Sequence, residues 1–356
     1  MEKLKELYIN FMLSSFGKIE VTKLEKVLDK RYSHDKFTRM LLNTEVDDER
    51  VLWQQTKSLL RDFENEDDGC ILIDDTILDK PYTKENEINC WHYDHSVGRS
   101  VKGIGMLNFH YSDKSEISIP LGYEIITKSE SHYDEKSKKV RRKSLFSKNE
   151  IMQDKLEILT FHNEVKYRYI LADKWFASSE NMAFIDKVLQ KKFIFPLKKN
   201  RTVALSLKDK INGKYVSISD IDTEGFSSRL VYLKGCDKPF KLLKQVEKNI
   251  NDDEPNYLYL LTNDIGLTSQ EILEIYKRRW KIEEYHKSLK QNLKIEHSPT
   301  RVEASMRSHI HLAVTGFIKL EKLRLQHKMN HFALKEKVYI EALKSAFEKI
   351  QSLEVA

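Results

Sequence analysis

Three acidic residues in this sequence stand where their carboxylates could act together. Asp74 directly follows the apolar run 70–73, Asp173 follows the run 168–172, and Glu283 lies within a long helical pattern. A single acid at the end of a strand is most often a helix N-cap or a turn former. As a set, three carboxylates from two buried strands and a helix would form an oxygen cage of the kind that Mg²⁺ or Mn²⁺ prefers. Two such ions could support phosphodiester chemistry.

The helical pattern around Glu283 is rich in cations. Thr268 and Glu271 have the spacing of a capping box, and the lack of Gly and Pro predicts one continuous helix from 268 to 293. One face of this helix, at about 100° per residue, carries Tyr276, Arg279, Trp280, Glu283, Lys287 and Lys290. A solvated ladder of i,i+4 ion pairs would also alternate in charge. Three cations and two aromatic rings around one acid leave an excess of positive charge, which favours an anionic partner.

Four residues of this face carry a resemblance to a known family. The pattern Tyr276-x2-Arg279-x3-Glu283-x6-Lys290 resembles the Y-R-E-K signature of DDE transposases from bacterial insertion sequences, in the group usually numbered four.

Both acids of the strands also have counterparts in this family. The run 74–76 (Asp-Asp-Thr) resembles its Asp-x-Thr motif, and the run 171–173 (Leu-Ala-Asp) resembles its second acidic motif. Asp75 is an alternative to Asp74 as the acid of the first motif. We favour Asp74 because Thr76 then lies two residues further on, on the same face of the strand.

The resemblance implies a role for each matching residue. The ligands of two Mg²⁺ or Mn²⁺ ions in each active site would be Asp74, Asp173 and Glu283. The phosphates of the DNA end would be held by Tyr276, Arg279 and Lys290. Lys287, on the same helix face, is a further candidate for contact with DNA. Arg201 ends the cationic run 193–201 and is either a DNA contact or ordinary surface charge.

The resemblance implies an α/β fold with a ribonuclease H-like mixed sheet flanked by helices. Residues 1–65 show helical periodicity and suit either a small DNA-binding bundle or a helical cap. The catalytic core is expected in two parts, 66–192 and 263–320, around a β-rich insertion at 193–262. Residues 321–356 form a helical segment that either contacts a second subunit or packs on the core.

Composition limits the remaining possibilities. The 356 residues include 61 Lys and Arg against 55 Asp and Glu, and the 40 % of hydrophobic residues exclude wholesale disorder. Three scattered cysteines, no export signal and no membrane-length apolar run lead us to expect a cytoplasmic protein. The resemblance to transposases of bacterial insertion sequences implies in addition a bacterial protein at the nucleoid. Cys90, His92 and His95 have metal-like spacing, but no second pair follows, so a polar loop is expected there rather than a zinc site.

The resemblance therefore implies a transposase that cuts double-stranded DNA at the ends of an insertion sequence and joins the 3′-hydroxyl to target DNA. Because two DNA ends need two active sites, a homodimer is expected. Two alternatives stay open: a non-catalytic DNA-binding repressor derived from a transposase, and a metal-dependent nuclease that does not join strands.

Overall fold

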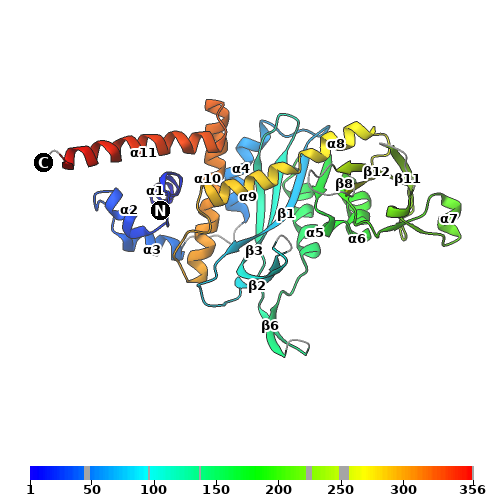
Figure 1. Ribbon diagram of the computed structural model, residues 1–356, viewed down its shortest axis with the longest axis horizontal. Helices are drawn as coiled ribbons and strands as arrows, with labels where there is room; N and C mark the ends of the chain where they lie inside the picture. Colours follow the sequence, from blue (N-terminus) through cyan, green and yellow to red (C-terminus); the bar gives the residue numbers. More distant parts are fainter. Residues whose placement is uncertain (44–48, 95–96, 136–137, 222–226, 248–255, 355–356) are drawn as a thin grey trace.

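A mixed β-sheet runs through the centre of this computed structural model, with helices packed on both faces (Figure 1). The structure describes residues 1–43, 49–94, 97–135, 138–221, 227–247 and 256–354. In spatial order the main path of the sheet is β11 (Ser227–Val231), β12 (Phe240–Glu247), β13 (Asn256–Thr262), β8 (Lys192–Pro196), β7 (Tyr169–Ala172), β1 (Cys70–Asp79), β3 (Arg99–Ser112) and β2 (Asn89–Asp94). β4 (Ile119–Ile125) pairs with the second half of β3. The expected α/β architecture is confirmed.

Three neighbouring strands, β1, β7 and β8, run parallel to one another. Parallel strands are covered on both faces, which is why the first half of β1 and all of β7 are continuous apolar runs. Both expected strands are therefore confirmed. Asp74, however, lies within β1 and not at its end, because β1 continues its antiparallel pairing with β3 as far as Asp79.

Opposite faces of β1 are covered by different helices. Successive residues of a strand point to opposite faces of a sheet. The Asp74 carboxylate lies 3.9 Å from His286 of α9 (Trp280–Gln291), whereas the Asp75 carboxylate lies 2.5 Å from Lys148 of α5 (Lys148–Glu157). β1 is thus held between α9 and α5.

Helices from both ends of the sequence share the core with the sheet. The amino-terminal helices are α1 (Glu2–Ser14), α2 (Val21–Val27), α3 (His34–Asn43) and α4 (Glu49–Arg61). α1, α3 and α4 pack against the long helix α10 (Glu303–His327). One hydrophobic cluster includes Tyr8 of α1, Phe37 of α3, Ile73 of β1 and Phe317 of α10. α11 (His331–Glu354) extends away from the body at the same end of the molecule (Figure 1).

The segment 193–262 is rich in strands, as the sequence predicts. Most of these strands belong to the central sheet. β13 pairs with β8, β12 pairs with β13, and β11 pairs with β12 at the edge. β9 (Thr202–Val203) and β10 (Val216–Ser217) form a separate pair, with α7 (Leu207–Ile211) between them in sequence. The far end of the molecule in Figure 1 is made of this segment.

The basic run that precedes α5 contributes to a hairpin. β5 (Glu130–Asp134) pairs with β6 (Lys139–Lys143), and the two strands project from the body (Figure 1).

The prediction of one continuous helix over 268–293 is wrong. The capping box of Thr268 and Glu271 is present and starts α8 (Ser269–Lys277), but α9 begins only at Trp280. Between them the amides of Arg278 and Arg279 bond to carbonyls three residues earlier, so one tighter turn separates the two α-helices.

The polar loop expected around Cys90 is also wrong. Cys90 and His92 lie on β2, where the Cys90 Sγ is 3.4 Å from His92 Nε2. His95 lies outside the described residues. None of the helices in the described part of the chain combines the length and apolar character that crossing a membrane requires.

Candidate active site

Asp74 and Asp173 occupy neighbouring positions on two parallel strands. The last paired residues of β1 and β7 are Ile73 and Ala172, and each is followed directly by one of these acids. Adjacent strands lie about 4.8 Å apart, so the two acids are brought together by the sheet itself.

Burial and like charge make the ionised form of Asp74 unfavourable. Its side chain is only 19 % exposed. Burial raises the pKa of Asp74 to about 7, and the carboxylates of Asp75 and Asp173 act in the same direction against the opposing influence of Arg279. An acid with this pKa in a cluster of acids is typical of a functional site.

Two residues that the sequence did not single out lie beside Asp74. Asn108 stands directly opposite Asp74 in β3, and its Nδ2 donates to His286 Nε2 over 3.0 Å. Burial lowers the pKa of His286 to about 3, with Lys290 and Arg279 acting in the same direction, so the ring is neutral. Since Nε2 accepts a hydrogen bond in this arrangement, the proton of the neutral ring belongs on Nδ1, which faces Asp74.

A buried oxygen at this site has no partner. Asn108 Oδ1 is buried and forms no hydrogen bond within the described structure. Together with the two acids it gives an environment of oxygen atoms, the donor type that hard divalent cations take. His286 could have been identified from the sequence, because it follows Glu283 by three residues and therefore lies on the same side of α9.

Asp75 points away from these groups. Its ion pair with Lys148 lies on the α5 side of β1. The structure therefore places Asp74 toward the signature residues of α9 and Asp75 on the opposite face.

Asp173 also caps a short helical turn, which is the common role of an acid that follows a strand. Its side chain accepts a hydrogen bond of 2.5 Å from the Lys174 amide and caps the short 3₁₀ turn Lys174–Phe176. One carboxylate oxygen is engaged in this cap, which fixes the side chain next to Asp74.

Glu283 is held by Arg279. The Arg279 Nη2 atom donates to Glu283 Oε1 over 2.6 Å, and the guanidinium lies 5.9 Å from the centre of the Tyr276 ring. Arg279 also interacts electrostatically with Asp74. Among the described residues, no group of three or more His, Cys, Asp or Glu side chains is arranged to hold a metal ion. The structure thus joins Asp74, Asp173 and Arg279, with Glu283 paired to the arginine.

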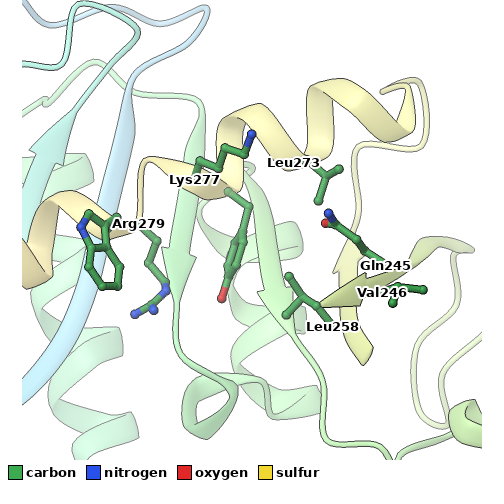
Figure 2. A pocket seen from close by; sticks show the side chains of 8 residues that line it. Gln245, Val246, Leu258, Leu273, Lys277 and Arg279 are labelled. Carbon is green, nitrogen blue, oxygen red and sulfur yellow. The ribbon is translucent and has the colours of Figure 1, made fainter. Parts of the chain in front are cut away.

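An open pocket of about 520 Å³ adjoins the Arg279 side of the site. Tyr276, Arg279 and Trp280 line it from the α8–α9 region, and Gln245 and Leu258 line it from β12 and β13. Figure 2 shows the guanidinium of Arg279 pointing away from the α8–α9 backbone, on the same side as the strand residues.

The other predicted DNA contacts are placed elsewhere. Lys290 pairs with Glu296 over 2.9 Å and donates to the Ile77 carbonyl over 3.1 Å. Lys287 lies 5.1 Å from the centre of the Phe332 ring, toward α11. Arg201 donates to Ser179 over 2.6 Å, in a separate cavity near the ends of β7 and β8.

Arg278 fixes the turn between α8 and α9 to the start of β1. Its guanidinium donates to the Asp68 carbonyl over 2.6 Å and to Cys70 Sγ over 3.6 Å, and lies 3.3 Å from the Asp68 carboxylate. This anchor positions the neighbouring Arg279 over the strand that carries Asp74.

Comparison with known proteins supplies the last observation on this site. The family model described as "Transposase DDE domain" matches residues 65–316, a region that contains Asp74, Asp173 and Glu283. No curated protein sequence matches this chain.

Proposed function

This chain belongs to the transposase DDE domain family, and from that premise we propose that it cuts DNA at the ends of an insertion sequence and joins the freed 3′-hydroxyl to target DNA. The observation that carries the proposal is the placement of Asp74 and Asp173 on adjacent parallel strands of a ribonuclease H-like core, with Arg279 facing Asp74. Acting on chromosomal DNA implies a cytoplasmic protein at the bacterial nucleoid.

The donor atoms of the site fit divalent cations. Asp74 is buried beside a second carboxylate, and a positive charge there would relieve both the desolvation and the repulsion that raise its pKa. Asp74 and Asp173 would hold Mg²⁺ or Mn²⁺, with Glu283 completing the set for two ions per active site. When bound, such ions supply Lewis-acid activation of the attacking oxygen and stabilise the leaving oxygen.

Arg279 links DNA binding to the availability of Glu283. Its planar guanidinium matches phosphate oxygens as well as it matches a carboxylate. A DNA phosphate bound by Arg279 would compete with Glu283 for the same donors and release that carboxylate toward Asp74. Tyr276, on the same pocket wall, offers a hydroxyl donor to the phosphate, and Lys290 and Lys287 add positive charge along α9.

His286 and Asn108 act as positioning residues in this scheme. Asn108 fixes the ring of His286, and the Nδ1 proton of the ring is directed at Asp74 Oδ2. The neutral ring would thereby help to position the Asp74 carboxylate.

A homodimer follows from the chemistry, because two DNA ends need two active sites. The exposed face of α11 supports it: Ile340, Leu343, Phe347 and Ile350 are between 42 % and 65 % exposed and follow one another at intervals of three and four residues. That spacing places all four on one side of the helix, as in a two-stranded helical contact. α1–α4 are then available to contact DNA at the same end of the molecule.

The decisive test compares Glu283→Gln with wild type on labelled DNA that carries the flanking element ends, in the presence of Mg²⁺ or Mn²⁺. Glu284→Gln is the matched control, since Glu284 is an adjacent glutamate that pairs with Lys281 and has a side chain 48 % exposed. We expect metal-dependent cutting at the element end by wild type and the control, and none by Glu283→Gln with DNA binding retained.

Each other outcome has a definite meaning. Equal cutting by all three proteins would remove Glu283 from the metal site. Tight binding without cutting by wild type would indicate the repressor, and cutting without strand joining would indicate a nuclease.

A further inference from the structure

A second cavity, of about 600 Å³, opens at the same edge of the sheet as the two acids. β7 and β8 are parallel, so their carboxyl ends lie next to each other. Lys174 and Trp175 follow β7 directly after Asp173, and Lys198 follows β8 by two residues. The cavity therefore lies one strand further along this edge from Asp74. We call it the Trp175 pocket, lined chiefly by Lys174, Trp175, Lys198, Arg201 and Lys234.

The charge of the Trp175 pocket is uncompensated. Four of its lining residues are cations, and no carboxylate lines it among the residues that the structure describes. None of the four forms a salt bridge with an acid in the described part of the chain, and Arg201 donates instead to the Ser179 hydroxyl over 2.6 Å. Surface charge of both signs is the usual pattern on a soluble domain, and four cations around one concavity point to an anionic ligand.

Trp175 adds a flat aromatic surface to this concavity. Its side chain is 51 % exposed although it lines a cavity, and the Lys198 Nζ lies 5.6 Å from the centre of its ring. Exposed tryptophans beside cations are the arrangement with which proteins hold single-stranded nucleic acid, since every base has a face that can stack. A phosphate held by Lys198 would bring its own base within reach of the Trp175 ring.

We propose that the Trp175 pocket binds one unpaired nucleotide of a DNA strand, with the base against Trp175 and the phosphate held by Lys198 and Arg201. The inference rests on the proposed function only in taking DNA as the ligand. Both a free nucleotide and a nucleotide within a DNA strand carry the base and phosphate that this pocket would recognise. Because Trp175 lies two residues after Asp173, we favour a nucleotide that belongs to a strand, since the same strand could also reach the acids.

The test is a binding measurement without metal, so that it does not depend on cleavage. Fluorescence anisotropy in EDTA gives the affinity of the full chain for a short blunt duplex and for the same duplex with a few unpaired nucleotides at one end. We expect the unpaired extension to tighten binding to wild type by roughly 5- to 150-fold, the range for one stacked base. Trp175→Ala should lose this gain, and Trp175→Phe should retain most of it.

Trp91→Ala is the matched control, because Trp91 is 55 % exposed on β2 and does not line the pocket. An equal gain from the extension in Trp175→Ala and in wild type would overturn the proposal. Displacement of the extended DNA by free deoxynucleotide at the same concentration of nucleotide units would also overturn it, in favour of a free nucleotide. Wild type that binds both duplexes equally refutes this inference alone, whereas wild type that binds no DNA refutes the proposed function.

Discussion

Replacing Asp74 by Asn should stabilise the metal-free protein, and the gain should grow as the pH rises. Burial raises the pKa of Asp74 to about 7 from an ordinary value of 3.8. An acid whose pKa is raised by folding binds its proton more tightly in the folded state than in the unfolded state. Ionisation of Asp74 therefore destabilises the fold above pH 3.8, increasingly so up to about pH 7, and the penalty is constant at higher pH.

The size of the effect follows from the shift in pKa. One pKa unit corresponds to about 1.4 kcal/mol, so the penalty is about 2 kcal/mol at pH 5 and about 4 kcal/mol at pH 8. The Asp74 side chain is 19 % exposed, so solvent screens this cost only slightly. Asn has nearly the same shape as Asp and carries no charge. Most of the penalty should therefore be removed by Asp74→Asn.

Urea denaturation of both proteins in EDTA at pH 5 and pH 8 measures the difference. Asp75→Asn is the matched control, since it makes the same chemical change one residue later. The half-buried ion pair of Asp75 with Lys148 would be lost, so this variant should be no more stable than wild type. Adding Mn²⁺ should stabilise wild type and narrow its deficit relative to Asp74→Asn, because binding to the folded state alone raises its stability.

A free energy of unfolding for Asp74→Asn that equals or falls below that of wild type at pH 8 would refute this reasoning. A difference that is independent of pH would do so equally, because it would show that the charge of Asp74 is not the source of the cost.

Two further predictions concern the carboxy-terminal helices. Glu321 is fully buried, and burial opposes its ionisation. Hydrogen bonds from His331 and Arg324 nevertheless hold its pKa below the ordinary value. Glu321→Gln should therefore lower the free energy of unfolding by about 3 kcal/mol, measured by urea denaturation at pH 7. This loss should shrink as the pH falls below 4.5 and wild-type Glu321 itself becomes protonated. Phe347→Glu places a charge in the exposed apolar face of α11 and should convert a dimer to a monomer in sedimentation equilibrium. Ser345→Glu introduces the same charge on the opposite, exposed side of α11 and should leave the dimer intact, and a monomeric wild type would contradict the proposed contact.

The strands could be predicted from sequence because their signals are local. The runs 70–73 and 169–172 are apolar throughout, as strands covered on both faces must be, and the structure places them in the centre of the sheet. The turn between α8 and α9 has no such signal. It is stabilised by the contact of Arg278 with Asp68, which lies 210 positions away in the chain, and no pattern of residues within the helix reveals it.

Some contacts of the candidate site could likewise be predicted from the sequence, and others could not. The proximity of Asp74 and Asp173 follows from two buried runs that each precede an acid, provided that the strands are parallel neighbours. The pairing of Glu283 with Arg279 is the i,i+4 ion pair that the helix pattern offered as an alternative. Asn108 could not be predicted, because its place opposite Asp74 depends on the register of β1 against β3.

Without metal, the two strand acids are held close together and Glu283 is paired with Arg279. Asp74 and Asp173 are fixed by the sheet and by a cap, so their repulsion cannot be relieved by movement of the backbone. Arg279 acts on both Asp74 and Glu283, and its single charge can neutralise only part of the negative charge of the three acids. If a DNA phosphate takes Arg279, the uncompensated charge around Asp74 increases, and the affinity of the proposed metal site for divalent cations should rise with it. DNA and metal should therefore bind with positive coupling, and Arg279→Gln should weaken that coupling even where it leaves the affinity for each partner measurable.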